Sequence, residues 1–269
     1  AATVEQAERL GCSICLLVPP LPHGGFQLAN IGQRPRTKGI SPLARNVILG
    51  LGNSKISRAM GTRKTRLYHE RHPLYEERIR DIRPGTLLEG YFQDERYFLN
   101  TGFQLRESIL ASGPPTGAFQ HWRDLIVRES SSIGLHFRRG DYLSESARTF
   151  HGVPSPEYFI RGVARLRAFG LDGPVFAFSD QPALIRKHLS SLAPVVVDPR
   201  GQLNALETLK LLALPRGKVL SNSSFSWWGG WLGQGESEVI APEPWYVSPE
   251  RRGINPTPKH WTKLSSNMC

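Results

Sequence analysis

Apolar and polar positions alternate most clearly in the second half of the chain. Ile133, Leu135 and Phe137 share one phase of a two-residue period, and His136 and Arg138 share the other. The pattern predicts a strand with one apolar face. His136 and Arg138 are expected side by side on its opposite face, near the carboxyl end of the strand.

Similar short segments continue to the end of the chain. Strands are expected at 133–137, 175–179, 194–197, 218–221 and 238–241, and helices at 156–169, 182–189, 205–214 and 223–232. Strands and helices that alternate with short connections are typical of a parallel sheet covered by helices on both faces. The second half is therefore predicted to be an α/β, Rossmann-like domain.

The first half is less regular. Its expected elements are a helix at 1–10, a strand at 10–18, a basic stretch rich in Gly, Pro and Ser at 34–66, a strand at 87–93 and a helix at 105–110. Because no capping residue precedes the first helix, we expect a strand and a glycine-rich loop before residue 1. The sequence SGPPTG at 112–117 indicates a linker, and we place two domains at 1–125 and 126–269.

The residues that follow the strand at 133–137 form the first candidate site. Arg138 and Arg139 are adjacent guanidiniums, which repel unless an anion or a carboxylate lies between them, and the planar fork of arginine suits phosphate oxygens. Gly140 permits a tight turn, and Asp141 is placed to hold one arginine. Since open α/β sheets bind ligands at the carboxyl ends of their strands, we predict an anion site. The alternative is a surface arginine pair at a turn.

A second candidate anion site begins where another predicted strand ends. Asn222 or Ser223 is suited to cap the next helix. The backbone amides of Ser224, Phe225 and Ser226 then face an anion, with the positive end of the helix dipole behind them. Later in this helix two adjacent glycines indicate a close approach, by the sheet or by a ligand, and its three tryptophans are interpreted as core.

Two further carboxylates, Asp180 and Glu207, have two interpretations each. Ser179 and Asp180 end the strand at 175–179 at the same sheet edge, where Asp180 either accepts hydrogen bonds from ribose hydroxyls or caps the next helix. Glu207 either reaches the site or pairs with Lys210 one turn further on.

Composition narrows the classes of partner. The 269 residues include 34 Lys+Arg against 23 Asp+Glu, for a formal net charge of +11, which favours acidic partners such as nucleotides, nucleic acid or the surface of an anionic membrane. An arginine-biased genome is the alternative origin of the charge. No groove-reading motif is present, so no nucleic-acid partner is predicted. Cys12 and Cys15 lack a second pair, so neither a zinc site nor a disulfide scaffold is expected.

Several motifs together resemble the α-1,2-fucosyltransferases. HFRRGDY at 136–142 is similar to their HxRRGDY motif, and GYFQDERYF at 90–98 resembles their GYFQSxxYF segment. FSD at 178–180, NSSFSWWGGWL at 222–232 and VIAP at 239–242 followed by Trp245 also match. The N-terminal GGLGNQ segment of the family is absent, and GGFQ at 24–27 resembles it only weakly.

The resemblance implies a GT-B-like fold of two Rossmann-like domains, here with the N-terminal, acceptor-side domain incomplete. It implies metal-independent transfer of L-fucose from GDP-fucose to the 2-hydroxyl of a terminal galactoside, with inversion. Arg138, Arg139 and Asp141 are then catalytic, because they act on the charge that builds on the departing GDP. The donor-binding residues are His136, Ser179, Asp180, Asn222, Ser223, Ser224, Phe225 and Ser226. Asp141 and Glu95 are the candidate bases for the acceptor hydroxyl.

A non-catalytic function is the alternative: a decayed or truncated relative that still binds a nucleotide. For localisation we expect the cytoplasm or the cytoplasmic face of a bacterial inner membrane, with peripheral membrane association allowed by the basic charge, or the Golgi lumen if the source is an animal.

Overall fold

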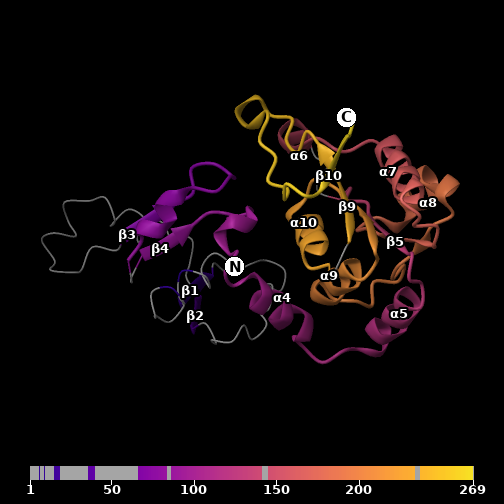
Figure 1. Cartoon of the computed structure of the whole chain (residues 1–269), viewed down its shortest axis with the longest axis horizontal. Coiled ribbons are helices and arrows are strands. Elements are labelled where there is room, and N and C mark those ends of the chain that lie inside the picture. Colours follow the sequence, from indigo (N-terminus) through magenta and orange to yellow (C-terminus); the bar gives the residue numbers. More distant parts are fainter. Residues whose placement is uncertain are drawn as a thin grey trace, which may run out of the picture. The chain divides into compact units, whose positions relative to one another are not determined.

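The structure, a computed structural model, describes Gln6, Arg9 and residues 15–18, 36–39, 66–83, 86–140, 145–233 and 237–268. The chain divides into two compact units, Ala1–Gly113 and Pro114–Cys269 (Figure 1). Several sequence predictions lie wholly or largely outside the described residues: the helix at 1–10, the basic stretch at 34–66, Cys12, the segment 24–27 and Asp141.

The described part of the first unit contains two pairs of short parallel strands. β1 (Cys15–Val18) pairs with β2 (Arg36–Gly39), and β3 (Arg66–His69) pairs with β4 (Thr86–Glu89). The 3-10 helices η1 (Glu77–Asp81) and η2 (Glu95–Tyr97) and the helix α4 (Gly102–Ala111) complete it. Strand β4 ends earlier than predicted, because the chain turns at Gly90 and passes through a left-handed conformation at Phe92.

The second unit is α/β. Its described strands form a six-stranded parallel sheet of β5 (Ile133–His136), β6 (Val175–Phe178), β7 (Val195–Val196), β8 (Gly217–Val219), β9 (Glu238–Glu243) and β10 (Thr262–Ser265). The helices are α5 (Gly117–Val127), α6 (Glu145–His151), α7 (Pro156–Ala168), α8 (Pro182–His188), α9 (Ala205–Ala213) and α10 (Ser224–Trp231), with η4 (Ser190–Leu192) and η5 (Pro249–Arg251). Every strand and helix predicted after residue 130 is present.

The strand order identifies the topology. Across the sheet the strands lie in the order β10-β9-β8-β5-β6-β7. Counted from β5, this is the 3-2-1-4-5-6 order of Rossmann sheets, whose ligands bind at the carboxyl ends of the strands where the winding reverses. The order confirms the predicted α/β, Rossmann-like second half and places the switch point between β5 and β8.

Two apolar layers cover the sheet. Ile133, Leu135 and Phe137 pack with α7 and α8 on one face, as the two-residue period predicts. Phe176 and Phe178 of β6 pack with α5 and α9 on the other. Because α5 packs against α9, it belongs to the second unit, and the division at 113/114 falls earlier than the boundary placed after residue 125.

The paired glycines of α10 serve packing. A Cβ on Gly229 would lie 2.4 Å from Leu212 Cδ2 of α9, and one on Gly230 would lie 2.7 Å from Leu220 Cδ1 at the end of β8. The sheet and the neighbouring helix therefore make the close approach that the glycines predicted. Trp227 and Trp231 are buried, in agreement with their interpretation as core, whereas Trp228 is only half-buried.

Candidate nucleotide-binding site

The two predicted anion sites meet at the switch point. The hydroxyl of Ser221, just after β8, donates to the carbonyl of His136 over 2.6 Å and accepts from the backbone N–H of Arg138 over 3.0 Å. These bonds continue the contact of β5 with β8 past the last ladder pair. The arginine segment and the N-terminal end of α10 therefore start from neighbouring points of the sheet.

Ser223 is the N-cap of α10. Its hydroxyl accepts from the backbone N–H of Ser226 over 3.1 Å, which decides between the two predicted caps. The first N–H groups of an α-helix have no acceptor within the helix. With that of Ser226 taken by the cap, the N–H groups of Ser224 and Phe225 are the donors at the helix tip, where the dipole favours an anion.

His136 joins the strand to this helix. Its Nδ1 is hydrogen-bonded to the hydroxyl of Ser226, and its ring lies 5.2 Å from that of Phe225. Burial lowers the pKa of His136 to about 3, and the charge of Arg138 adds to the effect. The imidazole is therefore neutral at physiological pH, so the positive potential here comes from Arg138 and the helix tip.

Asp180 holds the arginine segment. Its Oδ2 lies 3.3 Å from Nη1 of Arg138, and its Oδ1 accepts from the backbone N–H of Arg139 over 3.1 Å. A Cβ on Gly140 would lie 2.2 Å from Oδ2 of Asp180, so the glycine is needed for this approach. Asp180 thus makes the contact with an arginine that was predicted for Asp141, a residue outside the described ranges. Asp180 does not cap α8, whose N-cap Gln181 makes no side-chain cap bond.

Ser179 ends β6 beside Asp180. Its hydroxyl donates to the carbonyl of Phe137 over 2.6 Å and accepts from the backbone N–H of Gln181 over 2.9 Å. Ser179 therefore links the ends of β5 and β6.

The two arginines point to opposite faces of the sheet. Arg139 is buried, donates through Nη2 to the carbonyl of Pro154 over 2.8 Å, and lies 4.2 Å over the ring of Phe137. It shares the phase of Phe137, whereas Arg138 shares that of His136. The structure therefore brings Arg138, and not Arg139, to the face of the sheet that carries α10.

Asn222 and Glu207 have local structural contacts. The amide of the buried Asn222 donates to the carbonyls of His151, Gly152 and Trp245, and so fastens two loops. Glu207 forms a capping box with Asn204 and accepts from the backbone N–H of Thr116. Burial alone would raise the pKa of Glu207, but the bonds from Thr116 and Asn204 outweigh it and lower the pKa.

A pocket of about 520 Å³ opens at the carboxyl ends of β5, β6 and β7. That volume is in the range of sites for small molecules and cofactors. Its lining residues come from these strand ends and from the starts of α8, α9 and α10: His136, Arg138, Phe178, Ser179, Asp180, Pro182, Val197, Asp198, Pro199, Arg200, Gly201, Leu203, Ala205, Thr208 and Phe225.

The lining includes a loop that the sequence analysis missed. Residues 197–201 follow β7 and contribute Asp198 and Arg200. Asp198 accepts from the backbone N–H groups of Gln202 and Leu203 over 2.8 Å each, which fixes the loop. The sequence could have indicated this loop, because a loop at the carboxyl end of a parallel strand lies at the same edge of the sheet as the predicted site.

Within the ranges that the structure describes, no group of three or more His, Cys, Asp or Glu side chains is placed to hold a metal ion. None of the described helices is long and apolar enough to cross a bilayer.

The second unit and its site fall within a known sequence family. The sequence model of "Glycosyl transferase family 11" matches residues 85–264. The chain is 28% identical over 197 residues to an "Alpha-1,2-colitosyltransferase" of Escherichia coli. The matched region covers 71% of this chain and 67% of that protein. It is 24% identical over 193 residues to the "O-antigen biosynthesis glycosyltransferase WbnK" of Escherichia coli, covering 68% of this chain and 62% of that protein.

A solved structure is also similar. "Crystal structure of POFUT1 in complex with GDP" aligns with 12% identity and a TM-score of 0.42, over 89% of this chain and 92% of that one.

Proposed function

The chain belongs to glycosyl transferase family 11, and on that premise we propose that it moves L-fucose from GDP-fucose to the 2-hydroxyl of a terminal galactoside, with inversion. One observation carries most of the proposal. The guanidinium of Arg138, held by Asp180, lines the same pocket as Phe225 at the tip of α10. A fixed cation and a helix N-terminus at one switch point are what a sugar-nucleotide diphosphate requires.

The proposed chemistry follows from where charge develops. Transfer breaks the bond between C1 of fucose and the β-phosphate oxygen, so negative charge grows on GDP while the sugar ring gains oxocarbenium character. Arg138 and the N–H groups at the tip of α10 stabilise that leaving group more than the ground state, and losing one such donor costs about 3 kcal/mol of activation free energy. These groups supply charge without a metal ion.

The remaining site residues have supporting roles in this proposal. The neutral imidazole of His136 orients a phosphate or the guanine side of the nucleotide, and Arg139 braces the end of β5 through Pro154. Asp141 and Glu95 are the candidate bases for the acceptor hydroxyl. In a GT-B arrangement the first unit receives the acceptor.

The test is a transfer assay with two donors. The chain is incubated with GDP-fucose or GDP-colitose and a panel of galactose-terminated sugars, and products are analysed by mass spectrometry and NMR. GDP-colitose is included because a relative is named a colitosyltransferase. We expect a product that carries fucose on O2 of the galactose, with inverted configuration at the anomeric carbon of fucose. The yield should be the same when a chelator is present. Transfer of colitose alone would correct the donor. Binding of GDP without turnover would favour the non-catalytic alternative, and binding of DNA in preference to GDP would contradict both.

A further inference from the structure

The first unit presents one aromatic side chain almost fully to solvent. Tyr91 is 81% exposed, although both of its neighbours along the chain are held closely. Single exposed apolar side chains are common on protein surfaces, so exposure alone indicates nothing. What distinguishes Tyr91 is the way the backbone beneath it is built.

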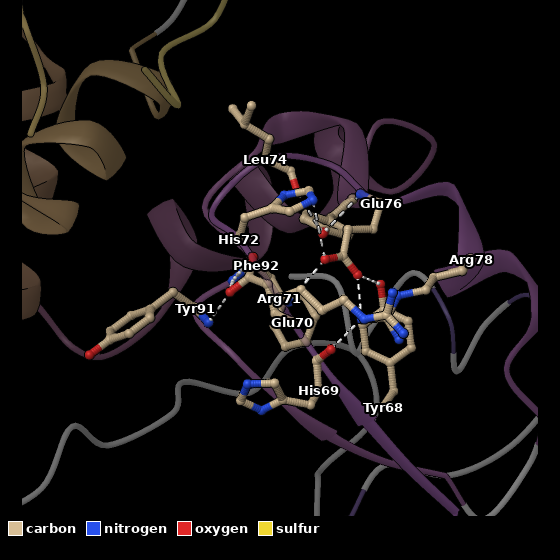
Figure 2. Close-up of polar contacts among 11 residues, drawn as sticks. Tyr68, His69, Glu70, Arg71, His72, Leu74, Glu76, Arg78, Tyr91 and Phe92 are labelled. Atoms are coloured by element: carbon tan, nitrogen blue, oxygen red, sulfur yellow. Dashed lines mark hydrogen bonds and ion pairs between the residues drawn. The ribbon is translucent and has the colours of Figure 1, made fainter. Parts of the chain in front are cut away.

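A buried carboxylate fixes that backbone. Glu70 follows β3 and accepts from the N–H of Tyr91 over 2.7 Å, and each of its oxygens accepts from the N–H of Phe92 over 3.1 Å. Figure 2 shows the ring of Tyr91 projecting away from this cluster while its backbone nitrogen faces Glu70. The carboxylate thus orients two successive residues at once.

The turn also has a conformational cost. Phe92 has a φ of 47°, and a left-handed conformation at a residue other than glycine is unfavourable unless the surroundings impose it. A Cβ on Gly90 would lie 2.4 Å from Cβ of Glu70, so a side chain there would push the carboxylate away. Such strained positions persist where neighbouring structure over-determines them, and they cluster at ligand sites.

The floor of the turn is rigid. The ring of Phe92 packs edge-on against that of Tyr97, with centroids 5.2 Å apart, and lies 6.1 Å from the ring of Tyr68. Tyr68 donates to Oε2 of the buried Glu76 over 3.0 Å (Figure 2). The hydroxyl of Tyr97 accepts from the backbone N–H of Glu76 over 3.1 Å. The ring of Phe92 is therefore held in place by its neighbours, while the ring of Tyr91 is exposed to solvent.

We propose that Tyr91 is the platform on which the acceptor galactose stacks, and that Glu70 is the positioning residue that holds it out; this rests on the proposed function. The axial O4 of galactose leaves H3, H4 and H5 on one face of the ring, and this apolar face matches a flat aromatic side chain. Tyrosine supplies contact area at little cost in conformational entropy, and a fixed backbone reduces that cost further.

The first experiment compares Tyr91→Ala with Phe103→Ala in the transfer assay. Phe103 is the matched control, since it is 71% exposed and lies in α4 of the same unit. Tyr91→Ala should raise the KM for the galactoside by about tenfold or more, equivalent to about 1.4 kcal/mol. The KM for GDP-fucose and kcat at saturating acceptor should stay within about twofold. Tyr91→Phe and Tyr91→Trp should retain most of the affinity, and Phe103→Ala should match the wild type. An unchanged acceptor KM in Tyr91→Ala, or an equal rise in Phe103→Ala, would overturn the assignment.

The second experiment tests Glu70. Glu70→Gln keeps the shape and one acceptor oxygen, and it should raise the acceptor KM by less than Tyr91→Ala does. Combined with Tyr91→Ala it should add nothing further, because both changes remove one interaction. Additive effects would show that Glu70 acts elsewhere.

Saturation-transfer NMR with methyl β-D-galactopyranoside separates this inference from the proposed function. The wild-type chain should saturate H3, H4 and H5 of the sugar most strongly, and Tyr91→Ala should lose that signal. If the wild type transfers neither donor sugar but gives this pattern, the proposed function fails and the galactose site stands. If the pattern is absent, the galactose site is refuted whatever the transfer assay gives.

Discussion

The imidazole Nδ1 of His136 is hydrogen-bonded to the hydroxyl of Ser226, 90 residues further along the chain. This contact joins the end of β5 to the first turn of α10. The strand carries Arg138 and the helix carries the free N–H donors. Their common geometry therefore depends on a buried, neutral histidine.

The neutral state of His136 predicts a pH dependence of stability. Burial lowers its pKa to about 3 from 6.5, so between these values the unfolded chain binds a proton that the native chain does not. The free energy of unfolding should fall as the pH is lowered through this window, by about 1.5 kcal/mol from pH 6.5 to pH 5 for this group. Urea unfolding of His136→Asn at both pH values should show a shallower dependence by that amount. His188→Asn, at an exposed position, should keep the wild-type dependence, and an equal dependence in all three chains would refute the prediction.

Two helices with hydroxyl N-caps, α10 and α5, allow a matched comparison. Ser223 caps α10 and Thr116 caps α5, and each hydroxyl accepts from an N–H three residues on over 3.1 Å. Replacing either by Ala should cost about 1 kcal/mol in the free energy of unfolding. Only Ser223→Ala should also weaken GDP binding, measured by calorimetry, because of the two helices only α10 faces the nucleotide in the proposed site. Equal GDP affinity in the two variants would remove α10 from the site.

Lys218, which does not line the pocket, predicts a further change in stability. It is fully buried in β8, its Nζ donates to the carbonyl of Pro215 over 2.5 Å, and burial lowers its pKa to about 7 from 10.5. Since the unfolded chain holds this proton up to higher pH, the free energy of unfolding should rise between pH 7 and about 10. Lys218→Met should remove that rise and stabilise the protein by about 1–3 kcal/mol at pH 7, as seen when buried charges are replaced by apolar side chains. Thermal and urea unfolding at both pH values check this. The exposed Lys187→Met serves as the control, and a loss of stability in Lys218→Met at pH 7 would contradict the prediction.

The sequence predicted the second unit well because its signals are local. The alternation at β5 and the short connections set the parallel sheet, and the serine cap sets the start of α10. Elements with weaker signals were missed. β10 has Leu264 as its one apolar residue, since it lies at the sheet edge. Helix α5 begins at Gly117, two residues after the prolines that indicated a linker.

The sequence predicted which segments lie together, the ends of β5 and β6 and the start of α10, but not the contacts of their side chains. Arg139 lies away from α10 because it shares the phase of Phe137, a consequence of the same two-residue period that was applied to His136. Asp180 is the partner of Arg138 through the adjacency of β5 and β6, which the sequence does not specify. The contacts of Glu70 could not be predicted for a different reason. Its partners are backbone N–H groups, which every residue except proline has, so the sequence does not indicate them.

The most direct test of the account is the affinity of Arg138→Lys for GDP, measured by isothermal titration calorimetry beside Arg139→Lys. Lysine keeps the charge and loses the planar fork that grips two phosphate oxygens. Arg138→Lys should bind GDP about tenfold more weakly, with a smaller loss for GMP. Arg139→Lys should lower the free energy of unfolding and leave GDP affinity within about twofold, since Arg139 is bonded to Pro154. Wild-type GDP affinity together with full turnover in Arg138→Lys would contradict the account.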